Sequence, residues 1–297
     1  MEPGTNHFHR KRRTFYSYLP ELILKLIQLT NQIYKGSNGR ESVYDLAIPE
    51  NWNNKLVVFI HGYMGYKDWG CWNLVQDFFT NQHFGFLKYN VSHNGGTVDN
   101  PIDFPDLDAF RKNSYPKELF DLNAILELVI EQFTELPKIY LIGHSRGGGI
   151  ALLQSTNPLV SKISTWAGIS YIKERSPSGK EREEWKRTGV YCRENGRTKQ
   201  QMPHDYAQFE EILDHEERMN IAAYCRQSII PTLVIHGDDD TSVNISEGQS
   251  ISSWLNVELS VIEGANHTFG ASQPWLDKKL PSHLQQVCEK TIHFFNQ

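Results

Sequence analysis

The stretch "IYLIGHSRGGGIALL" (Ile139–Leu153) joins two apolar runs through a short polar segment that centres on a serine. The first run has the composition of a buried strand, and the second run predicts a helix. Ser145 lies at the junction, between Gly143 and Gly147. A serine at this position either performs nucleophilic chemistry or caps the helix that follows it.

The Gly-x-Ser-x-Gly pattern between a strand and a helix is typical of a nucleophile elbow. On such a turn the hydroxyl projects freely, and larger residues two before and two after it would collide with neighbouring backbone. The helix N-terminus also brings N–H groups close to a developing oxyanion. Arg146 would contribute its backbone N–H, whereas the side chain of His144 should point away from the serine.

Two later strand ends supply the partners that a serine nucleophile needs. "VIHGDDDTSV" (Val234–Val243) ends one predicted strand with three carboxylates, and "VIEGANHTFG" (Val261–Gly270) ends the next with a histidine. Because open α/β sheets place their active sites at the carboxyl ends of strands, these segments should meet Ser145 at one edge. His267 would then take the proton of the serine, and an Asp would orient the imidazole.

With these motifs in this order, the chain resembles the α/β-hydrolase family from Val43 to the C-terminus. The family pattern His-Gly-x-x-Asp-x-x-Val implies Asp240 as the triad acid, with Asp239 as the alternative. The family also carries a His-Gly pair after an early strand, followed by the residue whose N–H completes the oxyanion hole. In "FIHGYMGYKDWG" (Phe59–Gly70) that residue is Tyr63, which would act together with Arg146.

Within the superfamily, the chain is similar to small intracellular carboxylesterases, including the cinnamoyl- and feruloyl-esterase-like group. The serine separates it from dienelactone hydrolases, which carry Cys there, and from dehalogenases and epoxide hydrolases, which carry Asp. The resemblance implies hydrolysis of a small-molecule carboxylic ester through a covalent acyl-enzyme. Two alternatives remain open: a small aminopeptidase or amidase of the prolyl-peptidase type, and a non-hydrolytic binding protein on the same scaffold.

Alternating strand-like and helix-like runs predict an α/β fold with a mostly parallel, twisted sheet and helices on both faces. Residues 22–34 fit either a strand or a helix, and with the strand at 42–49 they would form an opening hairpin. Further strands are predicted at residues 55–62, 84–92, 138–143, 162–169, 231–237 and 257–264. Helices are predicted at residues 73–81, 116–133, 146–155, 246–255 and 281–295, with Pro116 in a first turn.

The alternation breaks between Tyr171 and Ser228, and we interpret these residues as a cap inserted into a single domain that spans residues 1–297. The inserted segment predicts a tight hairpin turn at Asn195–Gly196 and one polar helix over residues 206–226. Four large side chains are candidates for the substrate pocket, with ordinary packing as the alternative for each: Trp69, Trp185, Tyr191 and Met202. Tyr66 and Trp72 are further candidates for the substrate pocket, with the same alternative.

Composition narrows the partners of this chain. It has 297 residues and a formal net charge of -5, which argues against a nucleic-acid or anionic-membrane surface. The basic run His9–Arg13 reads as a solvated tail, and the apolar stretch Leu19–Leu29 is too short to span a bilayer. The 4 cysteines have neither metal nor disulfide spacing, and "RGGGI" lacks the ending of a phosphate-binding loop. We therefore expect a cytoplasmic enzyme without metal or cofactor.

Overall fold

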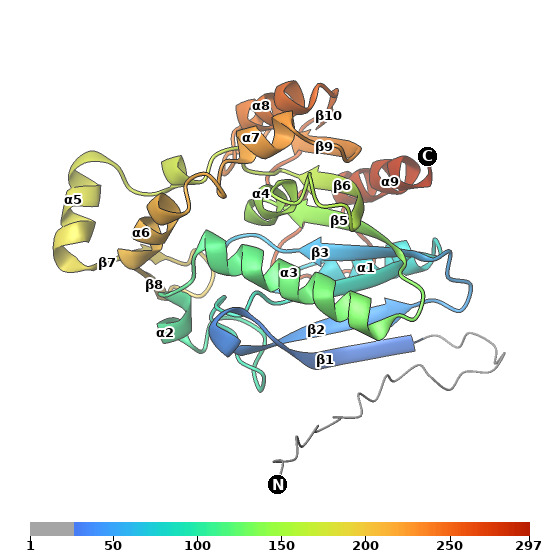
Figure 1. Ribbon diagram of the computed structural model, residues 1–297, viewed down its shortest axis with the longest axis horizontal. Helices are drawn as coiled ribbons and strands as arrows, with labels where there is room; N and C mark the ends of the chain where they lie inside the picture. The colour runs from blue at the N-terminus through green and yellow to red at the C-terminus, as the bar shows by residue number, and fades with distance from the viewer. Residues whose placement is uncertain (1–26) are drawn as a thin grey trace, which may run out of the picture.

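The computed structural model describes residues 27–297, which build an eight-stranded sheet in the order β1-β2-β4-β3-β5-β6-β9-β10 (Figure 1). β2 pairs antiparallel with β1 and β4, and the other neighbours pair parallel. The strands are β1 (Ile27–Lys35), β2 (Glu41–Ile48), β3 (Lys55–Ile60), β4 (Gly85–Tyr89), β5 (Lys138–His144), β6 (Val160–Trp166), β9 (Thr232–Gly237) and β10 (Leu259–Ile262). The mostly parallel sheet expected from the sequence is therefore confirmed.

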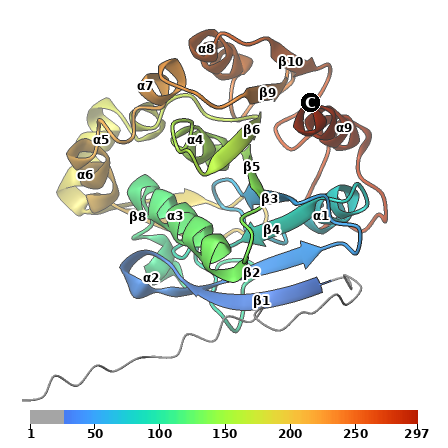
Figure 2. The same ribbon diagram turned by 45° about the vertical axis from the view of Figure 1, so that its right-hand side comes forward.

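Helices cover both faces of this sheet (Figure 2). One face carries α3 (Tyr115–Gln132), α4 (Arg146–Leu152) and α8 (Ile245–Leu255), and the other carries α1 (Trp72–Thr80) and α9 (Ser282–Asn296). Successive side chains of a strand point to opposite faces, so β3 serves both layers. Its Leu56 and Val58 join the apolar cluster beneath α3 and α4, whereas Val57 and Phe59 join the cluster beneath α1 and α9.

The opening segment is a strand, which resolves the ambiguity of residues 22–34 for the part that the structure describes. β1 pairs with β2 through a 3₁₀ turn at Ser37–Gly39, as the predicted hairpin requires. β1 is an edge strand and stays largely exposed, so it lacks the apolar pattern that marks the inner strands. Residues 22–26, the basic run His9–Arg13 and most of the stretch Leu19–Leu29 lie outside the described residues.

The segment between β6 and β9, here called the cap (residues 171–228), differs from expectation in two places. The predicted polar helix over residues 206–226 is wrong, because α6 (Ala207–Asp214) ends early and a separate α7 (Ile221–Arg226) follows. The Asn220 side chain accepts the Ala223 N–H and so begins α7, which packs against the main apolar cluster through Ile221. The cap also contains α5 (Gly179–Thr188).

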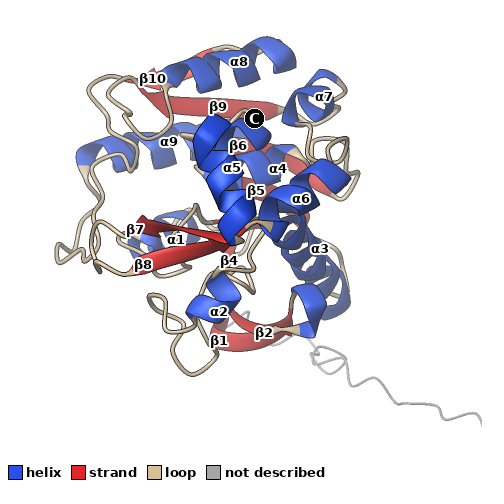
Figure 3. Cartoon of the chain, turned by 90° about the vertical axis from the view of Figure 1, so that its left-hand side faces the viewer, coloured by secondary structure: helices blue, strands red, loops and turns tan. Residues whose placement is uncertain are grey.

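The predicted tight turn at Asn195–Gly196 is also wrong. β7 (Val190–Glu194) and β8 (Gln201–Asp205) form the expected antiparallel pair, but residues 195–200 connect them (Figure 3). Asn195 Oδ1 accepts the backbone N–H groups of Arg197 and Thr198, both at 3.0 Å. This side-chain bonding stabilises a wide loop where a two-residue turn was expected.

Three further observations bear on the sequence expectations. The segment 93–113 contains the short helix α2 (Leu107–Phe110), which Asp106 caps by accepting the Ala109 N–H. Cys71, Cys192, Cys225 and Cys288 are free thiols, and only Cys192 is exposed. Over residues 27–297, no helix combines the length and the apolar character that crossing a membrane requires.

Candidate active site

Ser145 occupies a strained turn between β5 and α4, with φ 57° and ψ -120°. A Cβ on Gly143 would lie 2.2 Å from the carbonyl oxygen of Gly147, and a Cβ on Gly147 would lie 2.2 Å from that of Ile60. Both contacts are with backbone, of α4 in the first case and of β3 in the second, which cannot move aside without distorting its element. The two flanking glycines therefore have the steric task that the elbow pattern assigns to them.

The glycines that follow allow α4 to approach the chain beyond β6. A Cβ on Gly148 would lie 2.8 Å from Gly168 Cα, and one on Gly149 would lie 2.7 Å from Ile169 Cγ1. α4 is thereby packed tightly on the sheet edge directly behind the serine.

The structure brings Ser145, His267 and Asp240 together. Ser145 Oγ lies 3.0 Å from His267 Nε2, and His267 Nδ1 lies 2.7 Å from Asp240 Oδ2. Ser145 follows β5, Asp240 follows β9 and His267 follows β10, so three strand ends deliver the three side chains. Asp240 is 6% exposed, whereas the alternative acid Asp239 is exposed on the same loop.

Asp240 is held as a carboxylate by its surroundings. Burial alone would raise its pKa, but hydrogen bonds from His236 and His267 and the backbone N–H of Val243 hold the pKa well below its usual range. Ser242 and Val243 each donate a backbone N–H to Oδ1 at 2.8 Å. Oδ2 can therefore accept a hydrogen bond from His267 Nδ1–H. This bond fixes the tautomer of His267 in which Nε2, the nitrogen that faces Ser145, carries no proton.

His236 helps to position Asp240, although the sequence identified it only as the first residue of the His-Gly-x-x-Asp-x-x-Val pattern. Its Nε2 lies 2.9 Å from the Val243 carbonyl oxygen and 3.3 Å from Asp240 Oδ2. The side chain is completely buried at the end of β9. His236 therefore fastens the loop that carries the acid, and its place two residues before the acidic triplet was the available signal.

His144 precedes the nucleophile but does not face its hydroxyl, in agreement with the sequence expectation. Its Nε2–H donates to the carbonyl oxygen of His267 at 2.9 Å. Burial and the neighbouring His267 lower the pKa of His144 to about 3, so the ring is neutral. His144 thus holds the backbone of His267.

The two predicted oxyanion donors, Tyr63 and Arg146, flank the serine. Arg146 is the first residue of α4, where backbone N–H groups have no acceptor within the helix. The loop before Tyr63 lies against the nucleophile, because a Cβ on Gly62 would be 2.9 Å from Ser145 Cβ. His61 Nδ1 lies 2.9 Å from the Gly62 carbonyl oxygen, and its Nε2 accepts the Val91 N–H at 3.2 Å. His61, which the sequence marked only as the first residue of the His-Gly pair, fastens this loop.

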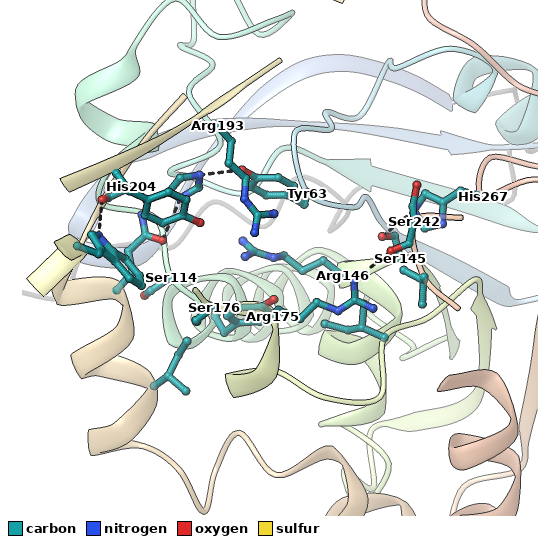
Figure 4. Close-up of a pocket in the computed structure, with 17 residues that line it drawn as sticks. Tyr63, Ser114, Ser145, Arg146, Arg175, Ser176, Arg193, His204, Ser242 and His267 are labelled. Carbon is teal, nitrogen blue, oxygen red and sulfur yellow. Dashed lines mark hydrogen bonds between the residues drawn. The ribbon is translucent and has the colours of Figure 1, made fainter. Parts of the chain in front are cut away.

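Two cavities meet at Ser145 and His267. The first, about 310 Å³, lies beneath the cap and is lined by Trp185 and Tyr191 among others (Figure 4). The second, about 540 Å³, is lined by Trp69, by Met64 and by Trp72. Ser145 therefore opens onto two spaces, one on each side of its hydroxyl-bearing side chain.

Met202 does not line the substrate pocket as predicted, and the side chain of Arg146 has a position that the sequence did not predict. Met202 is fully buried in a separate cluster with Tyr66 and Phe104, so it packs inside the cap interface and not on the wall of either cavity. The Arg146 side chain, expected to matter less than its N–H, reaches into the first cavity. Its guanidinium lies 4.0 Å from the centre of the Tyr115 ring.

The chain resembles solved structures but matches no protein-family model and no curated protein sequence. It superimposes on Est1E from Butyrivibrio proteoclasticus with bound ferulic acid at TM-score 0.65 and 17% identity, covering 90% of this chain and 100% of that one. A dienelactone hydrolase from Anabaena variabilis gives TM-score 0.58 at 15% identity, with 92% and 97% covered. The Pyrococcus furiosus esterase Pf2001 gives TM-score 0.59 at 15% identity, with 92% of each chain covered. Together with the sheet order, these likenesses show that the chain has the α/β-hydrolase fold.

Proposed function

We propose that this protein hydrolyses a carboxylic ester through a covalent acyl-enzyme. Ser145 Oγ bonds to the ester carbonyl carbon while His267 Nε2 takes its proton. The carbonyl oxygen becomes an oxyanion, which the N–H groups of Tyr63 and Arg146 stabilise. The tetrahedral intermediate then expels the alcohol, which receives the proton from His267. Water next attacks the acyl-enzyme while His267 takes its proton, and Ser145 leaves with that proton, which releases the carboxylic acid.

One observation carries this proposal: the continuous relay from Ser145 Oγ through the His267 ring to Asp240, with distances of 3.0 Å and 2.7 Å. A serine hydroxyl becomes a useful nucleophile only with such a base in place. The strained backbone of Ser145 supports the same reading, because strain of this kind costs about 1–3 kcal/mol and persists where function requires it.

The test uses p-nitrophenyl esters of short acids with the Ser145→Ala variant. We expect kcat/KM to fall by about a thousandfold or more, as is usual for loss of a triad nucleophile. Ser242→Ala is the matched control, because Ser242 is an exposed serine that lines the same two cavities and its backbone bond to Asp240 survives the change. Full activity of Ser145→Ala would contradict the assignment.

Two further measurements separate the alternatives. Turnover of aryl esters is compared with that of aminoacyl anilides, and a strong anilide preference would assign the site to amide hydrolysis. A fluorophosphonate probe should label the protein at Ser145 and leave Ser145→Ala unlabelled. Absence of labelling in the unchanged protein would favour a binding protein on this scaffold.

A further inference from the structure

Three arginines from separate segments reach the cavity beneath the cap. Arg146 comes from α4, Arg175 from the 3₁₀ turn Lys173–Arg175 at the start of the cap, and Arg193 from β7. Figure 4 shows the guanidinium groups of Arg146 and Arg193 pointing toward one another across the space beside Tyr63. The described residues that line this cavity include no Asp or Glu.

The positive charge in this cavity is only partly balanced. Arg146 Nη1 pairs with Glu118 at 2.8 Å, on the side of α3. Arg175 pairs with Glu247 of α8. Among residues 27–297, Arg193 has no carboxylate within ion-pair distance, and its guanidinium lies 5.8 Å from the centre of the Tyr191 ring. Three guanidinium groups therefore face two carboxylates, which leaves one positive charge directed at the cavity.

The other polar groups on the wall are neutral and do not cancel this charge. Burial raises the pKa of Tyr63 well above its usual range, so the phenol keeps its proton. Burial, together with the nearby positive charges of Arg146 and Arg193, lowers the pKa of His204 to about 3. The Tyr63 hydroxyl donates to His204 Nε2 at 2.7 Å, and the His204 ring stacks on Tyr191 with centres 4.7 Å apart. Flat, neutral aromatic groups therefore surround the guanidinium groups.

The second cavity carries no comparable surplus. Arg197, on the loop that joins β7 to β8, lines it, and this guanidinium pairs with Asp103. Trp69 and Trp72 supply much of the remaining wall. The two sides of the scissile bond thus meet different environments, one cationic and one apolar.

We propose that the cavity beneath the cap binds a carboxylate on the substrate, with Arg193 and Arg146 as its partners. The substrate class is then an ester that carries one free carboxylate, and this proposal rests on the ester hydrolysis proposed above. A planar guanidinium matches the geometry of a carboxylate and can donate two parallel hydrogen bonds to it. A single negative charge fits the single unpaired positive charge, whereas a phosphate monoester would bring about two at neutral pH.

The kinetic test compares matched esters that differ only in charge. In the acyl series, p-nitrophenyl hydrogen adipate is compared with its methyl ester, and in the alcohol series an acetoxybenzoate is compared with its methyl ester. We expect the charged member to be preferred in one series, and that series identifies the side of the bond that occupies the cavity. The preference should shrink as salt is added, since screening weakens the attraction.

The Arg193→Gln variant tests the assignment to this residue. It should reduce kcat/KM for the charged ester by about tenfold or more, the scale of one hydrogen bond to a charged group, and leave the neutral ester unchanged. Arg193→Lys, which keeps the charge without the fork, should retain part of the preference. Arg187→Gln is the matched control, because Arg187 is an exposed arginine of α5 that pairs with Glu184. Equal loss on both esters would overturn the role of Arg193.

A binding measurement keeps this inference separable from the proposed function. Calorimetric titration of Ser145→Ala with monomethyl adipate and with dimethyl adipate should show binding of the monocarboxylate only, and adding Arg193→Gln should abolish it. If the protein hydrolyses no ester but binds monomethyl adipate in this way, the proposed function fails and the carboxylate site stands. Lack of any charge preference in either ester series, together with lack of Arg193-dependent binding, would overturn the site.

Discussion

The Nε2 atom of His144 lies 2.9 Å from the carbonyl oxygen of His267, so the residue before Ser145 holds the loop that carries His267. The His144 ring is also packed 5.3 Å from the Trp72 ring, centre to centre. Ser145 and His267 are far apart in the sequence, and the side chain of His144, which takes no proton itself, thereby links their backbones.

This link predicts the effect of His144→Ala. The variant should lower kcat by about tenfold, because even a small misplacement of a catalytic group is costly, while KM changes little. His144→Gln, whose amide can still donate to the carbonyl oxygen, should recover part of the loss. A merely structural role would instead lower the melting temperature without any recovery of kcat by Gln.

The choice of acid is tested by Asp240→Asn. With an amide in place of the carboxylate, His267 would take the wrong tautomer, and kcat should fall on the order of 10⁴-fold. Asp239→Asn is the matched control, because Asp239 is the exposed neighbour on the same loop. Comparable losses in the two variants, measured with one p-nitrophenyl ester, would remove Asp240 from the relay.

The steric task of the elbow glycines is tested by Gly147→Ala. Its new methyl group would lie 2.2 Å from the Ile60 carbonyl oxygen, so the backbone of the elbow must shift. We expect a loss of about 1–3 kcal/mol in the free energy of unfolding, typical of overpacking, together with a loss of activity. Gly196→Ala is the control, since nothing lies within 4 Å of its Cβ position. Denaturant unfolding of both variants decides the question, and equal stability would contradict the steric account.

The buried, neutral His204 predicts a pH dependence of stability. Its folded pKa of about 3 lies below the unfolded value of about 6.5, so between these pH values the unfolded chain binds more protons. The stability from this group is therefore fully present above about pH 6.5 and is lost as the pH falls toward 3. His204→Gln should flatten the slope of unfolding free energy against pH over this window by up to about 1.4 kcal/mol per pH unit. An unchanged slope would show that His204 does not titrate in this way.

The elbow and the relay could be predicted from the sequence because their constraints are local. Gly143 and Gly147 are needed within one turn of the backbone around Ser145, whatever the rest of the molecule does. The end of a parallel strand has a fixed place at one edge of the sheet, so the segments after β9 and β10 had to arrive near Ser145. Choosing Asp240 over Asp239 needed the family pattern, and the geometry of the loop accounts for it through the bonds from Ser242 and Val243.

Inside the cap, local signals were outweighed by contacts with distant segments. Asn195–Gly196 favours a tight turn by itself, but the wide loop contacts distant segments, because Arg197 pairs with Asp103 and Gln200 Nε2 donates to the Phe104 carbonyl oxygen. Met202 looked available for a pocket, yet it is fully buried against Tyr66 and Phe104, which come from loops more than ninety residues earlier in the chain. Burial of this kind depends on which surfaces meet, and no short-range pattern records it.

The sequence by itself determined the sheet, the elbow and which side chains meet at the strand ends, because strand periodicity, glycine sterics and strand-end placement act over a few residues. Only the tertiary structure decided what surrounds them. Arg146, Arg175 and Arg193 lie on three different segments, and they face one cavity solely because the cap folds over the carboxyl ends of the strands. Their charges act on one another and on a substrate through space, so the charge of the site depends on packing that brings distant residues together.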